Sequence, residues 1–127
     1  MTVSNDNNLG PLLPAGGGGP SLSALAALRR ETDAAAWRRV SDVAQTCAKY
    51  LSCHPAVLAV RYPGLTTDAS YREASCTLEG GFGPLVDVCL VRDGAWLRYD
   101  ARTATGDARA EVLRLEHVLG SLWQWGV

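Results

Sequence analysis

The sequence, 127 residues long, predicts an α+β fold: a two-layer sandwich in which a small, mainly antiparallel sheet is covered on one face by helices. Three observations lead to this prediction. Apolar residues recur at steps of three and four from Trp37 to Leu51, which is typical of a long amphipathic helix. Two apolar runs flank Asp93-Gly94, a dipeptide that favours a β-hairpin because both positions tolerate positive φ. A second helical repeat follows this hairpin.

Residues 1–20 are predicted to form a flexible arm ahead of a single domain over residues 21–127. The arm is rich in Asn, Gly and Pro and ends in PAGGGGP, where four glycines would lose much backbone entropy on ordering. A phosphate-binding loop is the alternative for this run, but Pro20 stands where such a loop needs Gly-Lys-Ser/Thr. The short segment LGPLLP is apolar enough to dock on a partner or on the domain itself.

The first helical segment is predicted from Ser21 onward, and the second follows RRETD, where Thr32 or Asp33 can cap it. His54-Pro55 ends this second helix, because proline removes a donor and disfavours helical geometry in the residue before it. The apolar stripes of the two helices contain Leu22, Leu25 and Leu28, and then Trp37, Val40, Ala44, Cys47 and Leu51.

The rest of the chain is predicted to alternate short strands with helices. AVLAVRY is a strand closed by a turn at Pro63-Gly64, and residues 66–80 carry a weak helical period. Residues 85–91 would pair with residues 95–99 around the hairpin turn. Thr105 or Asp107 then begins a helix whose buried stripe contains Ala108, Val112, Leu115, Leu119 and Leu122.

Composition and charge narrow the class of protein. A formal net charge of −1 gives no field that would attract nucleic acid or an anionic membrane. No apolar run approaches the ~20 residues that a bilayer crossing needs, and the start MTVSNDNNLG lacks the features of a secretory signal. We therefore expect a cytoplasmic protein that binds neither nucleic acid nor membrane.

The cysteines do not predict a metal site or a disulfide framework. None of the four lies in a C-x-x-C pair. Cys53 and His54 could join other thiols on zinc, but adjacent ligands are poorly directed and the remaining spacings match no zinc finger or ribbon. We expect no metal, and we expect Cys47 and Cys89 to be small core residues.

Four segments carry a likeness to a known family: SDVAQTCAKYLSCHP, AVLAVRYPGL, GFG leading into LVDVCL, and AWLRYDARTATGDARAEVLRLEHVLGSL. They resemble the C-terminal domain of the pyridoxal-phosphate-dependent enzymes of Cys/Met metabolism, such as the cystathionine synthases and lyases and methionine γ-lyase. In that family a long helix ends near His-Pro, a strand ends in a Tyr-Pro-Gly-Leu turn, and Gly-Phe-Gly opens the next strand. The resemblance spans about residues 20–122.

The resemblance implies a role for Arg98, which falls where the family places the arginine that grips the substrate α-carboxylate. The chemistry suits this role, because a guanidinium offers a planar fork of donors to the two carboxylate oxygens. The alternative is an exposed strand arginine that pairs with a neighbour such as Asp87 or Asp100. The family's long insertion between these strands is reduced here to the Asp93-Gly94 turn.

The resemblance does not extend to the family's large domain, which holds the cofactor. Pyridoxal phosphate needs a lysine for its internal aldimine and for proton transfer. Lys49 is the only lysine in the chain and is predicted to point away from the core. We therefore expect no catalytic residue and no cofactor bound by this chain alone; the resemblance implies pyridoxal phosphate in a partner subunit.

Two functions remain open at this point. The first is a non-catalytic small subunit that docks on a separate pyridoxal-phosphate-dependent subunit of the trans-sulfuration type and completes its amino-acid substrate site, so that the two form a split lyase or transferase. The alternative is a self-associating binding or regulatory domain descended from such an enzyme. A small enzyme in its own right ranks last, because no nucleophile and base appear together. The candidate partner contacts are Arg38, Arg39, Trp123 and Trp125.

Overall fold

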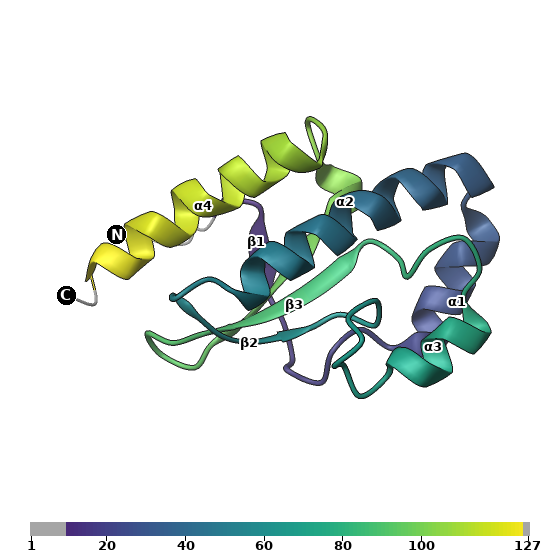
Figure 1. The fold of residues 1–127 in the computed structure, drawn as a ribbon, viewed down its shortest axis with the longest axis horizontal. Helices are drawn as coiled ribbons and strands as arrows, with labels where there is room; N and C mark the ends of the chain where they lie inside the picture. The colour runs from purple at the N-terminus through teal and green to yellow at the C-terminus, as the bar shows by residue number, and fades with distance from the viewer. Residues whose placement is uncertain (1–9, 126–127) are drawn as a thin grey trace.

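A computed structural model describes residues 10–125, with side chains described for residues 10–120, and it has the predicted α+β fold (Figure 1). Four strands form one antiparallel sheet, and two long helices pack on one of its faces. No helix within residues 10–125 has the length and apolar character needed to cross a membrane. The elements are β1 (Leu12–Pro14), α1 (Leu22–Glu31), α2 (Ala34–Ser52), β2 (Val57–Arg61), α3 (Tyr71–Thr77), β3 (Leu85–Leu90), β4 (Trp96–Asp100), the 3₁₀ turn η2 (Ala101–Thr103) and α4 (Ala108–Trp125).

Helices α1, α2 and α4 begin at side-chain caps. The Ser21 hydroxyl accepts from the Ala24 amide, and the Asp33 carboxylate accepts from two amides in the first turn of α2. The Asp107 carboxylate accepts from the Ala110 amide at 3.0 Å in α4. Two cap residues were predicted for α2 and two for α4, and in both helices the aspartate, not the threonine, is the cap. Each such cap contributes about 1 kcal/mol to helix stability.

The strand order is β1-β4-β3-β2, with the β3–β4 hairpin at the centre. The Asp93-Gly94 dipeptide lies in the turn of this hairpin, as predicted, but the loop is longer than two residues. β3 ends at Leu90, whose amide donates to the Ala95 carbonyl at 2.9 Å, and the Gly94 amide donates to the Leu90 carbonyl at 2.8 Å. Gly94 has positive φ, +70°, whereas Asp93 does not. In the hairpin register Asp87 lies opposite Arg98, and in the β2–β3 pair Asp87 also lies opposite Arg61. The side chains on the central strand therefore have a cross-strand neighbour on each side.

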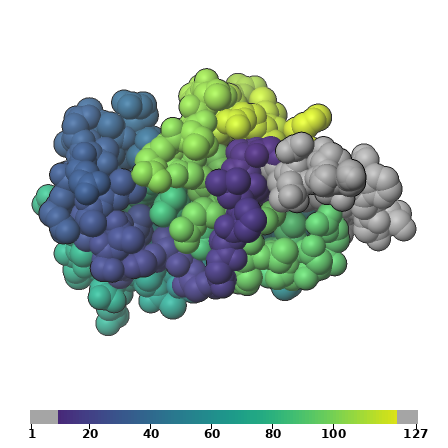
Figure 2. Space-filling model, turned by 180° about the vertical axis from the view of Figure 1, so that it is seen from behind, coloured from purple at the N-terminus to yellow at the C-terminus, as the bar shows by residue number. Residues whose placement is uncertain are grey.

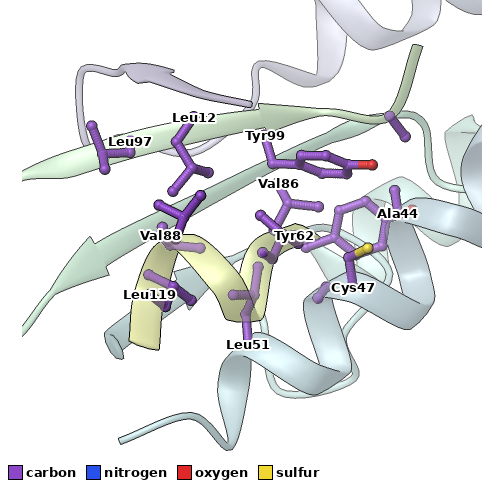
Figure 3. Packing of buried hydrophobic residues seen from close by; sticks show 14 of the residues in the cluster. Leu12, Ala44, Cys47, Leu51, Tyr62, Val86, Val88, Leu97, Tyr99 and Leu119 are labelled. Carbon is purple, nitrogen blue, oxygen red and sulfur yellow. The ribbon is translucent and has the colours of Figure 1, made fainter. Parts of the chain in front are cut away.

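The main core lies between the sheet and helices α2 and α4 (Figure 3). Val86, Val88 and Tyr99 point from the sheet towards Cys47 and Leu119 of the helices, and all five are at most 1% exposed. Burial raises the pKa of the Cys47 thiol to about 11, as expected for an unreactive core cysteine. Other residues of the main core are Leu12, Val43, Ala44, Ala48, Leu51, Ala56, Tyr62, Leu90, Leu97, Ala101, Leu115 and Val118.

Two of the sequence motifs meet beside this core. The Tyr-Pro-Gly-Leu segment forms a turn in which the Leu65 amide donates to the Tyr62 carbonyl at 3.0 Å. The buried Tyr62 hydroxyl donates to the Gly83 carbonyl at 2.8 Å, and the Gly83 amide donates to Ser41 Oγ at 3.0 Å. The turn after β2, the Gly-Phe-Gly segment before β3 and helix α2 are thus joined at one point.

A second, smaller core lies at one end of the sheet, where α1 and α3 pack together. Its centre is Trp37, 1% exposed, whose indole N–H donates to the Gly81 carbonyl at 3.1 Å. Leu85 connects this second core to the start of β3. The other buried members are Leu25, Ala74 and Leu78.

The expectation of a flexible arm over residues 1–20 is corrected for the part that the structure describes. Residues 12–14 form the edge strand β1, paired with β4, and Leu12 is 2% exposed in the main core. The described part of the apolar LGPLLP segment, residues 10–14, therefore docks on the domain itself, which was one of its two predicted partners, and the sheet has four strands. Residues 1–9 lie outside the described residues.

The glycine-rich residues 15–19, which we call the strap, cross the face of the sheet opposite α2 and α4. Figure 2 shows the N-terminal segment lying over the strands from this side. The Ala15 amide donates to the Trp96 carbonyl of β4 at 3.0 Å, and Arg61 Nη1 of β2 donates to the Gly18 carbonyl at 3.1 Å. The strap thus runs from one side of the sheet to the other.

Glu111 is a buried carboxylate that joins α4 to β4. It is 0% exposed and accepts from the Tyr99 hydroxyl at 2.6 Å, the Thr105 amide at 3.1 Å and Arg114 Nη1 at 2.8 Å. Burial by itself would raise the pKa of Glu111, but these donors together hold it below the ordinary value of 4.5. The carboxylate therefore stabilises the fold while it is ionised.

Glu111→Ala is expected to lower the free energy of unfolding at pH 7 by about 3 kcal/mol, because it leaves buried donors without an acceptor. Since the folded pKa is depressed, this contribution is complete above the ordinary value of 4.5 and is lost as the pH falls through the folded pKa. Urea unfolding between pH 7 and pH 3 should therefore show wild type and variant converging in acid. The exposed Glu73→Ala is the control, with a change within about 0.5 kcal/mol. A constant difference across this pH range would contradict the assignment.

Candidate functional site

The candidate site is the face of the sheet turned away from α2 and α4, which we call the outer face. Alternation along the strands places Val86 and Val88 in the main core and their neighbours on the outer face. The outer-face side chains are Leu13 of β1, Trp96 and Arg98 of β4, Leu85, Asp87 and Cys89 of β3, and Arg61 of β2.

Asp87 and Arg98 form a two-pronged ion pair at the centre of the outer face. Arg98 Nε donates to Asp87 Oδ1 at 2.6 Å, and Arg98 Nη2 donates to Asp87 Oδ2 at 3.0 Å. The Asp87 side chain is 0% exposed, whereas that of Arg98 is 35% exposed. The hydrogen bond with Asp87 raises the pKa of Arg98 above its ordinary value. The guanidinium is thus fixed in place by a carboxylate beneath it.

The fixed guanidinium keeps donors for a second acceptor. Asp87 uses the Nε and Nη2 atoms of Arg98, and Nη1 makes no hydrogen bond with the described residues. A guanidinium has further N–H groups on its Nη1–Nη2 edge, which suits a second carboxylate. The alternative predicted from the sequence, pairing of Arg98 with Asp87, is therefore what the structure shows, and ligand binding by Arg98 stays a prediction.

A second arginine on the outer face is also held by a carboxylate. Arg61 Nε donates to Asp68 Oδ2 at 3.1 Å, and the Asp68 side chain is 1% exposed. Burial opposes ionisation of Asp68, but hydrogen bonds from Arg61 and Ser70 keep its pKa below the ordinary value. No sequence motif marked Asp68, because its partner lies seven residues away across a turn.

Exposed apolar side chains lie on the sheet beside these charges. Leu13 of β1 faces Arg98 in the strand register and is 63% exposed. Leu58 of the edge strand β2 is 66% exposed. An arginine next to an exposed leucine is a composition that protein interfaces favour.

A separate hollow of about 380 Å³ lies where the end of α2 meets α4. His54 Nδ1 accepts from the Ala56 amide at 3.0 Å, so Nε2 carries the proton that is shared with Glu116 Oε1 at 2.8 Å. Tyr50 donates to the same oxygen, and these donors keep the pKa of Glu116 below its ordinary value. Both ring nitrogens of His54 are thus engaged: Nε2 connects the segment after α2 to α4, and Nδ1 fixes the turn before β2. The hollow is lined by Lys49, Tyr50, Cys53, His54, Pro55, Glu116 and Gly120.

The remaining predicted site residues are not gathered at one place. Arg38 and Arg39 are exposed on the first half of α2 and pair with no acid of the described residues. Lys49 is exposed near the other end of that helix, and His117 is exposed on α4. Trp123 and Trp125 lie outside the residues whose side chains are described. Within residues 10–120, no group of three or more His, Cys, Asp or Glu side chains is arranged to hold a metal ion.

Comparison with known proteins returned no relative: no family model matches the chain, and no curated protein matches it. The resemblance to the Cys/Met-metabolism enzymes therefore stays a prediction from the sequence.

Arg98→Ala is expected to lower the free energy of unfolding by about 3–5 kcal/mol, since it leaves the buried Asp87 carboxylate without its cation. Arg102→Ala is the matched control. Its guanidinium also grips a carboxylate, that of Asp100, at 2.6 Å, but its side chain is 50% exposed, so the loss should stay within about 1 kcal/mol.

The double variant Asp87→Leu/Arg98→Met should recover most of the loss in urea unfolding, because it removes both charges while keeping a similar volume. If the double variant were as unstable as the sum of its two single variants, the pair would not be the source of the stability.

Proposed function

We propose that the chain is a non-catalytic small subunit that docks, through the outer face of its sheet, on a separate pyridoxal-phosphate-dependent subunit of the trans-sulfuration type. In this proposal Arg98 completes the amino-acid substrate site of the partner. The observation that carries it is the position of Arg98: the resemblance gives this residue to the α-carboxylate, and its guanidinium has a free edge on the outer face.

The outer face has the features that such docking needs. Arg98 is anchored by Asp87, so little side-chain entropy is lost when a second carboxylate binds. Leu13 beside it offers apolar area that a partner would bury. The partner supplies the lysine and the cofactor, and this chain supplies a positioned cation.

Docking is tested by tagging the chain, capturing partners from an extract of cells that naturally express it, and reducing the complex with borohydride. Reduction converts a pyridoxal-phosphate aldimine into a stable phosphopyridoxyl-lysine, which mass spectrometry locates. We expect phosphopyridoxyl-lysine on the captured protein. Lys49→Ala in the tagged chain should leave the yield of phosphopyridoxyl-lysine unchanged. Capture of a protein without the group would count against the proposal.

Leu13→Asp is expected to reduce this capture at least about tenfold, since it places a charge in the apolar part of the interface. Leu113→Asp is the matched control, because Leu113 is also 63% exposed but lies on α4, away from the sheet. Equal losses with both variants would remove the outer face from the proposal.

Self-association is the second candidate, and the edge strand β2 favours it. β2 ends the sheet, and Leu58 on it is 66% exposed, so two copies could pair edge to edge. Sedimentation over a hundredfold range of concentration separates the two candidates. A dimer that Leu58→Asp dissociates, with no captured cofactor protein, would favour this alternative.

A further inference from the structure

We propose that the strap, residues 15–19, is a displaceable cover of the outer face: it opens while the rest of the domain stays folded, and it uncovers the surface around Trp96, Cys89 and Arg61. The inference rests on the proposed function in so far as this is the face on which we place the partner.

The strap is weakly attached. Its described hydrogen bonds to the sheet are the one from the Ala15 amide and the one to the Gly18 carbonyl. Residues 16–19 are glycines and bury no side chain of their own. Release of glycine returns more backbone entropy than release of any other residue, so the cost of opening is low.

The strap nevertheless lies tightly on the groups below it. Exposure alternates along the strap: Gly16 and Gly18 are exposed, whereas Gly17 and Gly19 are half-buried. A Cβ on Gly17 would lie 3.0 Å from the Trp96 ring, and one on Gly19 would lie 3.0 Å from the Arg61 guanidinium carbon. Both glycines also have positive φ, +93° and +83°, which other residues rarely adopt. The close fit therefore depends on glycine at alternate positions.

The ends of the strap are anchored independently of its middle. Before it, Leu12 is 2% exposed in the main core; after it, Leu25 of α1 is 0% exposed in the second core. Opening of residues 15–19 therefore disturbs neither core. Segments with few buried contacts between stable elements are those that open locally.

Cys89 provides a reporter for this opening. It lies on the outer face opposite Trp96, in the register of the β3–β4 hairpin, and is only 5% exposed although α2 and α4 pack on the other face. Its thiol donates to the Gly94 carbonyl at 3.4 Å, and we attribute its burial to Trp96 opposite it, on whose ring the strap lies. Cys47, 0% exposed in the main core, is the internal control, because it becomes accessible only when the core opens.

The experiment measures alkylation of Cys89 and Cys47 in the full chain, with the exposed Cys53 and Cys76 replaced by serine. We expect Cys89 to react at least about tenfold faster than Cys47, with a rate that low urea hardly changes, because local opening exposes little surface. The core variant Val43→Ala should speed Cys47 about tenfold and leave Cys89 unchanged. Equal rates with the same urea dependence, or equal acceleration by Val43→Ala, would overturn the inference.

Strap variants give the second readout. Gly17→Ala and Gly19→Ala should raise the Cys89 rate about tenfold through strain at positive φ. Gly16→Ala and Gly18→Ala are the controls, since a Cβ there meets no atom within 4 Å, and they should not raise it. The alkylation experiment tests whether the strap opens, and it needs no partner. Failure to capture a cofactor-bearing protein would therefore count against the proposed function alone. If capture succeeds, the two strained variants should increase it, and a decrease would mean that the closed strap is part of the interface, which would overturn the cover.

Discussion

The buried carboxylate of Asp87 is the constraint on which the organisation of the sheet depends. A carboxylate without access to water must have cationic or donor partners, and Asp87 has Arg98 opposite it on β4. A slip of β4 by one residue would turn Arg98 into the main core and Tyr99 out of it, so the ion pair and the apolar pattern select the same register. The same pairing fixes the guanidinium on the outer face, where the proposed function needs it.

The helices and the hairpin could be predicted because local signals agree with the tertiary structure there. The repeat from Trp37 to Leu51 and the Asp93-Gly94 turn each contain their own evidence, in periodicity and in turn chemistry. The edge strand β1 could not be predicted, because its pairing depends on a strand more than eighty residues away, and the glycine-rich sequence that follows it is typical of a linker. Pairing of Arg98 with Asp87 or Asp100 could be predicted as an alternative, because these residues belong to one predicted hairpin, and the structure shows Asp87. The contacts of the strap and of Asp68 could not be predicted, because no local motif marks them.

Residues of the motifs behind the family resemblance make hydrogen bonds that connect elements of this fold. Tyr62 joins the turn after β2 to the segment before β3, and His54 joins the segment after α2 to α4 with both ring nitrogens engaged. These contacts give the motif residues structural roles in this chain, so the motifs by themselves do not point to a reaction. The functional part of the resemblance therefore depends on Arg98, and the physical test of that role is whether its free edge meets a carboxylate from another molecule.

The composition of the strap is only partly explained by its fit. The close approach to Trp96 and Arg61 requires glycine at Gly17 and Gly19, but a Cβ on Gly16 or Gly18 would meet no atom within 4 Å. Glycine at these two exposed positions raises the entropy gained on release. Strong anchors at Leu12 and Leu25 on either side show that the chain can hold this region firmly where it needs to. Weak attachment between two firm anchors is the arrangement expected of a cover that leaves and returns.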